Sequence, residues 1–255
     1  MKKILNIENI SLNYHTKQGE IKALDDITFD VFDGEFIAII GPSGCGKTSI
    51  LSIIAGLITP SSGKVFLDGE EVLKPTSSIG YMLQKDQLFN WRTIEKNALL
   101  PLEIHKKQKD AESKKKVELL LKKYGLWEFR KAYPTELSGG MRQRAALIRT
   151  LAPSPNILLL DEPFSALDYQ TRLSVCDDVY NIIKREKKTA ILVTHDISEA
   201  IALADRIIVL TKRPSKILNV HKIDTDKSLS PLKRREDKGF STWFERLWRE
   251  LNYES

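Results

Sequence analysis

The sequence has 255 residues, of which 42% are hydrophobic and 29% are charged, a balance that suits one large globular domain or two small ones. Two cysteines cannot make a disulfide framework, the start of the chain lacks the apolar stretch of a signal peptide, and no segment approaches the roughly 18 apolar residues of a membrane span. The net charge of +6 comes from stretches that mix acids with bases and lack aromatic residues for base stacking, notably 106–123 and the region near 233–235. We therefore expect a soluble cytoplasmic protein with no nucleic-acid partner.

The predicted elements alternate between strands and helices. Strand patterns occur at residues 4–12, 27–31, 35–40, 64–67, 156–160, 189–193 and 207–210. Helical patterns occur at residues 47–55, 93–150, 169–186 and 198–204. This alternation predicts an α/β fold with a mostly parallel sheet, and the long helical stretch predicts a helical insertion in its middle.

The turn after the strand at 35–40 has the spacing of a phosphate-binding loop, G-x-x-x-x-G-K-[ST]. Its residues are Gly41, Pro42, Ser43, Gly44, Cys45, Gly46, Lys47 and Thr48, followed by Ser49 in the next helix. Glycines let backbone N–H groups curl around a phosphate without Cβ clashes, and the helix directs its positive end at the same anion. We expect Lys47 to reach the β- and γ-phosphates and Thr48 to ligate Mg²⁺. The alternative is a glycine turn without a ligand.

Two adjacent carboxylates, Asp161 and Glu162, end the buried strand that begins near residue 156. Parallel α/β sheets place their ligands at the carboxyl ends of strands, so these side chains are candidates for the same phosphate chemistry. Asp161 is expected to hold Mg²⁺, and Glu162 is expected to polarise the attacking water. Two solvated acids at a strand end are the alternative.

Between these two motifs, the run Leu137, Ser138, Gly139, Gly140 and Met141 resembles the signature of the nucleotide-binding subunits of ABC transporters. Ser138 can cap a helix whose first amides the glycines expose, which makes a second phosphate site. The resemblance covers residues 3–215 and implies a P-loop (RecA-like) core with an antiparallel β subdomain and an inserted helical subdomain. It also implies ATP and Mg²⁺ as cofactors and a head-to-tail homodimer in which each signature closes over the partner's ATP.

Four further residues match landmarks of that family. The resemblance implies that Tyr14 stacks on adenine, that Gln84 touches Mg²⁺ and relays the nucleotide state, that Asp168 lies in a dimer-contact loop, and that His195 contacts the γ-phosphate. Glu162, His195 and Lys47 would then be the catalytic residues. The alternatives are a half-buried strand tyrosine, a surface amide and a structural histidine. Met141 stands where glutamine is commoner, which puts little in doubt.

The resemblance also divides the chain. It implies an ATPase domain over 1–215, with the core and β subdomain at 1–85 and 152–215 and the signature subdomain at 86–151. Residues 216–255 form a C-terminal extension. Its apolar residues recur at helical spacing, which predicts an amphipathic helix. We favour packing of this helix on its own domain over binding to a membrane or partner.

Residues 84–93 are similar to a segment of the nitrate, sulfonate and taurine importers, a subgroup that includes uptake systems for thiamine-precursor pyrimidines. The resemblance implies a separate permease that docks a short helix near Gln84–Trp91, against Leu88, Phe89 and Trp91. It implies an extracytoplasmic substrate-binding protein and a place at the cytoplasmic face of the membrane. Ordinary internal packing is the alternative for these side chains. A non-transport ABC ATPase acting on nucleic acid is the alternative function, but it would need a longer coiled-coil insertion.

Overall fold

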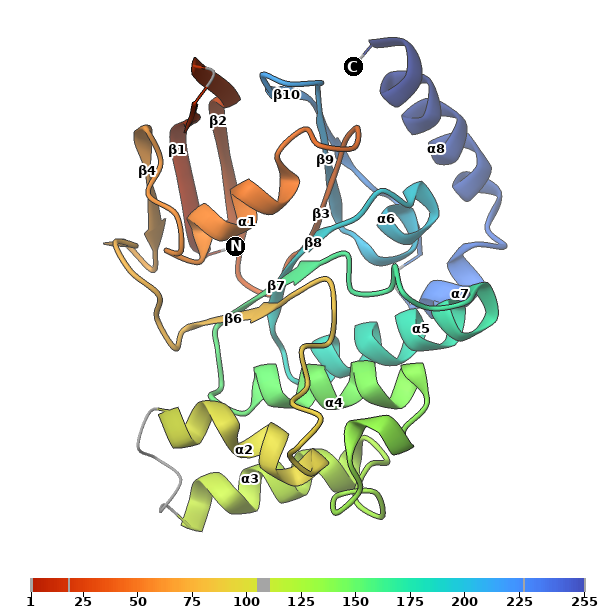
Figure 1. The fold of residues 1–255 in the computed structure, drawn as a ribbon. Coiled ribbons are helices and arrows are strands. Elements are labelled where there is room, and N and C mark those ends of the chain that lie inside the picture. Colours follow the sequence, from red (N-terminus) through yellow and green to blue (C-terminus); the bar gives the residue numbers. More distant parts are fainter. Residues whose placement is uncertain (1, 18, 105–110, 227, 255) are drawn as a thin grey trace. The chain divides into compact units, whose positions relative to one another are not determined.

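The computed structural model describes residues 2–17, 19–104, 111–226 and 228–254, which fall into two compact units. The first unit comprises residues 1–76 and 187–255, and the second comprises residues 77–186 (Figure 1). Within the described ranges, no helix has both the length and the apolar character that crossing a bilayer requires. Residues 106–110 of the basic stretch lie outside the described residues.

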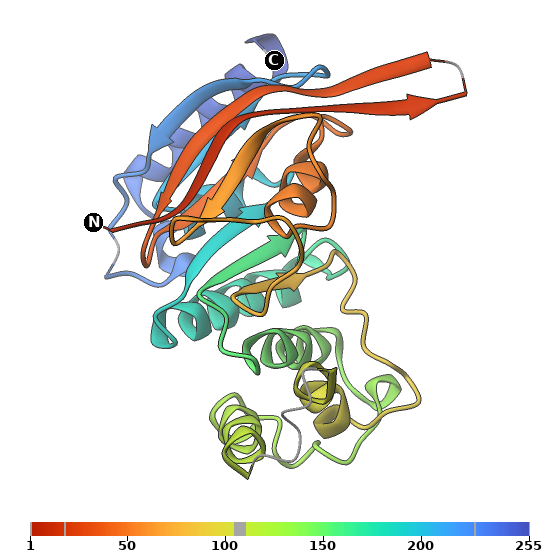
Figure 2. The ribbon, with the colours of Figure 1, turned by 90° about the vertical axis from the view of Figure 1, so that its left-hand side faces the viewer.

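The first unit contains an antiparallel sheet with the strand order β2-β1-β4-β5. Its strands are β1 (Lys3–Thr16), β2 (Gly19–Phe32), β4 (Ser62–Leu67) and β5 (Glu70–Glu71). Figure 2 shows β1 and β2 side by side over their length. Both strands are longer than predicted, because pairs such as Asn13 with Lys22 hold an exposed polar stretch in extended form. Cross-strand hydrogen bonding thus overrides the local polar pattern.

A second set of strands in the first unit has the order β10-β9-β3-β8. These strands are β3 (Phe36–Ile40), β8 (Thr189–Val193), β9 (Arg206–Leu210) and β10 (Ile217–Lys222). β3 runs parallel to both β8 and β9 and is fully buried, which confirms the predicted parallel core. β10 was not predicted: it pairs antiparallel with β9 and is mostly half-exposed, so its pattern is weak. The helices α1 (Lys47–Ile54) and α6 (Ile197–Leu203) follow β3 and β8.

The second unit holds the predicted helical insertion. Its helices are α2 (Ile94–Ile104), α3 (Ala111–Lys123), the 3₁₀ turn η1 (Pro134–Glu136), α4 (Gly139–Leu151) and α5 (Tyr169–Arg185). The strands β6 (Ile79–Met82) and β7 (Ile157–Asp161) pair in parallel. β6 was missed because it is four residues long and contains Gly80. A Cβ on Gly80 would lie 2.8 Å from the Thr150 side chain, so only glycine fits there.

The C-terminal residues of the first unit form α7 (Pro231–Arg234), α8 (Lys238–Arg249) and a π-helical turn, η2 (Glu250–Glu254). Leu247 of α8 is fully buried, and α8 contacts α6. The indole Nε1 of Trp243 donates to Oδ1 of Asp224 at 2.7 Å, while Trp248 is 52% exposed. The predicted amphipathic helix is therefore confirmed, and its buried face packs on its own unit.

Candidate nucleotide-binding site

The glycine-rich loop lies between the carboxyl end of β3 and the start of α1. Gly44 and Gly46 have φ angles of 74° and 107°, a left-handed region that favours glycine. Lys47 is only 7% exposed, and its Nζ donates to the carbonyl oxygens of Gly41 at 2.8 Å and Pro42 at 3.0 Å. The ammonium group is thus folded onto the loop itself. Ser43 and Thr48 are exposed, Pro42 and Ser49 are half-buried, and the Cys45 side chain is buried.

The N-terminus of α1 differs from that of the helices that follow α3. Its N-cap is Gly46, which offers no side-chain acceptor. In contrast, α4 to α8 each have an N-cap side chain that accepts from a first-turn amide, namely Ser138, Asp168, Asp196, Ser230 and Asp237. Unsatisfied first-turn amides and the helix dipole favour an anion. The start of α1 therefore has the chemistry of a phosphate site.

Two more predicted residues flank this loop in the first unit. The hydroxyl of Tyr14 on β1 lies 2.9 Å from Oγ of Ser49 on α1, and Tyr14 is 38% exposed. An aromatic ring is thus held beside the start of α1. His195 follows β8 and is exposed. The next residue, Asp196, caps α6 by accepting from the amides of Ser198 and Glu199, which fixes the backbone where His195 leaves the strand.

The acidic pair lies at the end of β7 in the second unit. Asp161 is 4% exposed and accepts from the Tyr81 hydroxyl at 3.3 Å. Glu162 has φ at 44°, an uncommon conformation for a residue with a side chain, and accepts from Nε2 of Gln84 at 3.3 Å. The structure thus brings Gln84 and Glu162 together. Sequence reasoning missed Tyr81, although its place on the segment leading to Gln84 could have indicated it.

The signature residues begin α4. Oγ of Ser138 accepts from the Met141 amide at 3.3 Å, which confirms the predicted cap. The two glycines are also tightly packed, because a Cβ on Gly139 would lie 2.9 Å from the Leu167 side chain, and one on Gly140 would lie 2.8 Å from Val175. Packing therefore favours glycine at Gly140, while the tip of Leu167 could shift to admit a small side chain at Gly139.

Asp168 begins α5, and its Oδ1 accepts from the Thr171 amide at 3.1 Å. Hydrogen bonds from Thr171 hold the pKa of the Asp168 carboxyl below its usual value. The carboxylate is therefore ionised at neutral pH and stabilises the helix start.

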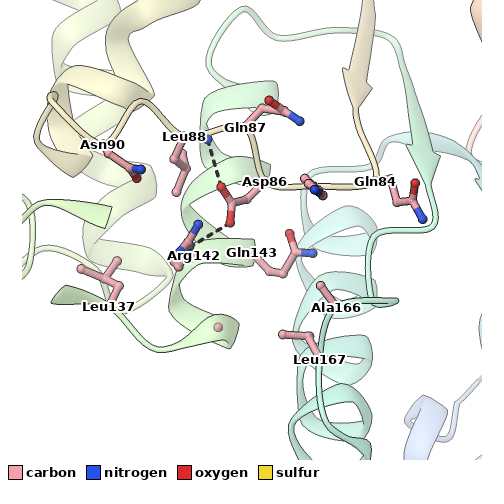
Figure 3. Close-up of a pocket in the computed structure, with 12 residues that line it drawn as sticks. Gln84, Asp86, Gln87, Leu88, Asn90, Leu137, Arg142, Gln143, Ala166 and Leu167 are labelled. Carbon is pink, nitrogen blue, oxygen red and sulfur yellow. Dashed lines mark hydrogen bonds and ion pairs between the residues drawn. The ribbon is translucent and has the colours of Figure 1, made fainter. Parts of the chain in front are cut away.

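The segment after Gln84 is held by the signature helix around a pocket of about 510 Å³ (Figure 3). Asp86 accepts from Nε of Arg142 at 2.9 Å and from the Leu88 amide at 3.0 Å. Arg149 donates to the carbonyl oxygens of Asp86 and Gln87, both at 2.6 Å, and burial lowers the pKa of its guanidinium. Sequence reasoning missed these arginines, because nothing local marks a contact across some sixty residues.

Gln143 is a third member of α4 that reaches out of the helix. It is 4% exposed, and its Nε2 donates to the carbonyl oxygen of Pro163, the residue after Glu162. The helix that carries the signature is therefore bonded both to the segment after Gln84 and to the end of the acidic strand. Sequence reasoning did not single out Gln143.

The predicted permease-facing side chains have different environments. Leu88 is mostly buried and lines the pocket, which is compatible with either a docking role or ordinary packing. Phe89 and Trp91 stack with ring centroids 4.7 Å apart, and Trp91 is 75% exposed. Asn97, buried beneath this loop, accepts from the Phe89 amide and donates to the carbonyl oxygens of Phe89, Arg92 and Thr93. One buried amide thus fixes the loop that presents Trp91.

The residues proposed for a metal are Thr48, Gln84 and Asp161. Hydroxyl, amide and carboxylate oxygens are the ligands that Mg²⁺ prefers, with nucleotide phosphates supplying the rest of its coordination. Each of these three side chains therefore carries an oxygen donor of the kind that a nucleotide-bound Mg²⁺ takes. Across the described ranges, no cluster of three or more His, Cys, Asp or Glu side chains could hold a metal by itself.

Comparison with known proteins gives a consistent result. A family model described as "ABC transporter" matches residues 24–165. The chain is 49% identical over 249 residues to the uncharacterized ABC transporter ATP-binding protein YtlC of Bacillus subtilis, covering 97% of this chain and 95% of that protein. It is 40% identical over 233 residues to the aliphatic sulfonates import ATP-binding protein SsuB of Bacillus cereus, with coverages of 91% and 90%. A dimeric post-hydrolysis structure of the ATP-binding cassette MJ0796 with ADP and Pi superposes with a TM-score of 0.73 at 31% identity, covering 88% of this chain and 100% of that chain.

The packing around Gly140 predicts a specific stability defect. Gly140→Ala should lower the free energy of unfolding by about 1–3 kcal/mol, because the new methyl group overlaps Val175. Denaturant titration measures this, and Val175→Ala in the same chain should recover part of the loss by making room. A Gly140→Ala chain as stable as the wild type would contradict the packing argument.

Proposed function

Because this chain belongs to the ABC transporter family as an ATP-binding, ATP-hydrolysing subunit, we propose that it is the motor of an importer. Two copies close head-to-tail around two molecules of MgATP and drive a separate membrane permease. The observation that carries this proposal is the start of α1, which has no side-chain cap and lies beside a lysine folded onto a glycine-rich loop. That arrangement is suited to the phosphates of a nucleotide.

The hydrolytic roles are distributed among residues at element ends. Backbone amides from Gly41 to Ser49 cradle the phosphates, Lys47 exchanges its loop carbonyls for phosphate oxygens, and Tyr14 stacks on the base. Thr48, Gln84 and Asp161 supply the oxygen ligands for Mg²⁺, which when bound neutralises charge on the phosphates. Glu162 polarises the attacking water, and His195 donates a hydrogen bond to the γ-phosphate. The hydrogen bond from Gln84 to Glu162 keeps the carboxylate engaged before the nucleotide arrives.

Dimer closure uses the second helix start. Ser138 and the two glycines present the first turn of α4 to the γ-phosphate held by the partner's loop, and Asp168 lies in the dimer contact. The dimeric structure of the cassette MJ0796, all of which matches 88% of this chain, supports this arrangement.

The loop that carries Trp91 is the proposed permease contact, at the cytoplasmic face of the membrane. Exposed Trp91, stacked on half-buried Phe89, and the buried Asn97 beneath them suit a rigid surface that receives a short helix. The permease in turn meets an extracytoplasmic substrate-binding protein.

The transported molecule is proposed from similarity. The SsuB relative is named for the import of aliphatic sulfonates, and the segment at 84–93 resembles the nitrate, sulfonate and taurine subgroup. We infer a small sulfonate-like anion, with a thiamine-precursor-like pyrimidine as the second choice. The substrate binds to other polypeptides of the transporter.

Glu162→Gln should separate ATP binding from hydrolysis. The amide keeps the shape of the side chain but cannot act as a base, so hydrolysis should fall about 10²–10⁴-fold while ATP still binds. Sedimentation velocity with MgATP should then detect a stable dimer of the variant. Lys47→Ala is the control that should lose ATP binding and the dimer. Hydrolysis by Glu162→Gln at the wild-type rate would refute the role of this carboxylate.

Trp91→Ala should weaken the complex with the permease. Loss of a central aromatic contact typically costs at least about 2 kcal/mol, which is roughly 30-fold in affinity. Co-purification of the variant with the permease measures the effect. Trp248→Ala removes another exposed tryptophan and should co-purify normally. Equal recovery of both variants would place the permease elsewhere.

The substrate is tested by growth. A strain from which the gene for this chain has been deleted should fail to grow with an alkanesulfonate as sole sulfur source, yet grow normally on sulfate. Complementation with the wild type should restore growth, and complementation with Glu162→Gln should not. Normal growth on sulfonates with a requirement for thiamine precursors would favour the pyrimidine instead.

A further inference from the structure

The turn between β9 and β10 reaches the glycine-rich loop within the first unit. Nη2 of Arg213 in this turn donates to the carbonyl oxygen of Gly44 at 2.6 Å. We propose that Arg213 is a positioning residue that holds the turn of the loop at Gly44, so that the start of α1 stays in the position in which it binds phosphate. This inference rests on the proposed binding of a nucleotide at the loop.

The peptide between Gly44 and Cys45 is held at both of its polar ends. Its carbonyl oxygen accepts from Arg213, and its N–H, on Cys45, donates to the carbonyl oxygen of Pro42 at 3.2 Å. Gly44 has a left-handed φ of 74°, and glycine crosses between backbone regions more easily than other residues. Apart from neighbours in the chain, the nearest heavy atom to a Cβ built on Gly44 is Nη2 of Arg213, at 3.9 Å. Arg213 is therefore the side chain that restrains this otherwise uncrowded turn, together with the backbone hydrogen bond to Pro42.

Two cations bind three of the carbonyl groups of the loop. Nζ of Lys47 binds the carbonyl oxygens of Gly41 and Pro42, and the guanidinium of Arg213 binds that of Gly44. Lys47 must leave its carbonyls if it is to contact phosphate oxygens. Arg213 approaches from a different segment of the chain, so its hydrogen bond can persist when a nucleotide is bound.

The turn that carries Arg213 has a rigid base. The amide of Thr211 donates to the carbonyl oxygen of Lys216 at 3.0 Å, and the amide of Lys216 donates to Oγ1 of Thr211 at 2.9 Å. Buried Ser215 is joined to β2: its amide donates to the Ala23 carbonyl at 3.0 Å, and its carbonyl accepts from the Asp25 amide at 2.9 Å. The turn is thus tied to a neighbouring strand, which fixes the point from which Arg213 extends.

The test compares four variants of the full chain by equilibrium binding of ATP and by steady-state hydrolysis. Arg213→Ala should weaken ATP binding about tenfold, the effect of losing one hydrogen bond from a charged donor. The KM for ATP should rise with little change in kcat, because the loop holds the phosphates alike in the ground and transition states. Arg213→Lys, which keeps a charged donor, should recover most of the affinity.

Lys212→Ala is the matched control, since it removes the same charge from the adjacent position of the same turn and should bind ATP as the wild type does. Lys47→Ala reports on the loop itself and should abolish binding. The thermal melting of all variants without nucleotide should match that of the wild type.

Three outcomes would overturn the inference. The first is wild-type affinity for ATP in Arg213→Ala. The second is an equal loss of affinity in Lys212→Ala, which would indicate a general electrostatic effect, and the third is no recovery of affinity in Arg213→Lys. If the wild type itself binds no ATP, the proposed function fails as well. If both Arg213 variants bind ATP with wild-type affinity while Lys47→Ala does not bind ATP, the proposed function stands without this inference.

Discussion

The N-cap of α1 is a glycine, which has no side chain to cap the first-turn amides, and the proposed activity depends on this constraint. A helix start normally has its amides satisfied by a Ser, Thr, Asp or Asn at the N-cap, as the starts of α4 to α8 are. At α1 the N-cap is a glycine with positive φ, so the acceptor has to come from elsewhere. The loop before the helix bends at Gly44 and Gly46, which have positive φ. The ammonium group of Lys47 donates to the carbonyl oxygens of Gly41 and Pro42 in the same loop.

Local patterns in the sequence predicted the groups whose chemistry is encoded within a few residues. The glycine spacing, the strand before it and the helix after it located the loop at Gly41 to Thr48. The cap at Ser138 and the helix at α5 were predicted for the same reason, since N-caps and apolar periodicity are short-range features. The parallel core was predicted because the strands β3, β7 and β8 are apolar along nearly their whole length, which is typical of strands buried on both faces.

The features that were missed depend on long-range contacts. β10 is a weak strand that forms because β9 offers it an edge, and β6 is a short strand aligned by β7. The contacts of Arg142 and Arg149 with the segment after Gln84, and that of Arg213 with Gly44, join residues between 56 and 169 positions apart. An arginine that serves a distant carbonyl has the same local pattern as one exposed to solvent.

The grip of Arg142 and Arg149 on Asp86 and Gln87 has a mechanical consequence. Three side-chain hydrogen bonds join the segment that leads to Trp91 with α4, the helix capped by Ser138. They restrict movement of the segment relative to the helix. Under the proposed function, one end of this linkage meets the permease and the other meets the partner's nucleotide. A movement imposed by the permease on the loop at Trp91 would then shift α4 as a rigid body. The start of this helix would move toward or away from the γ-phosphate without much internal deformation of the second unit.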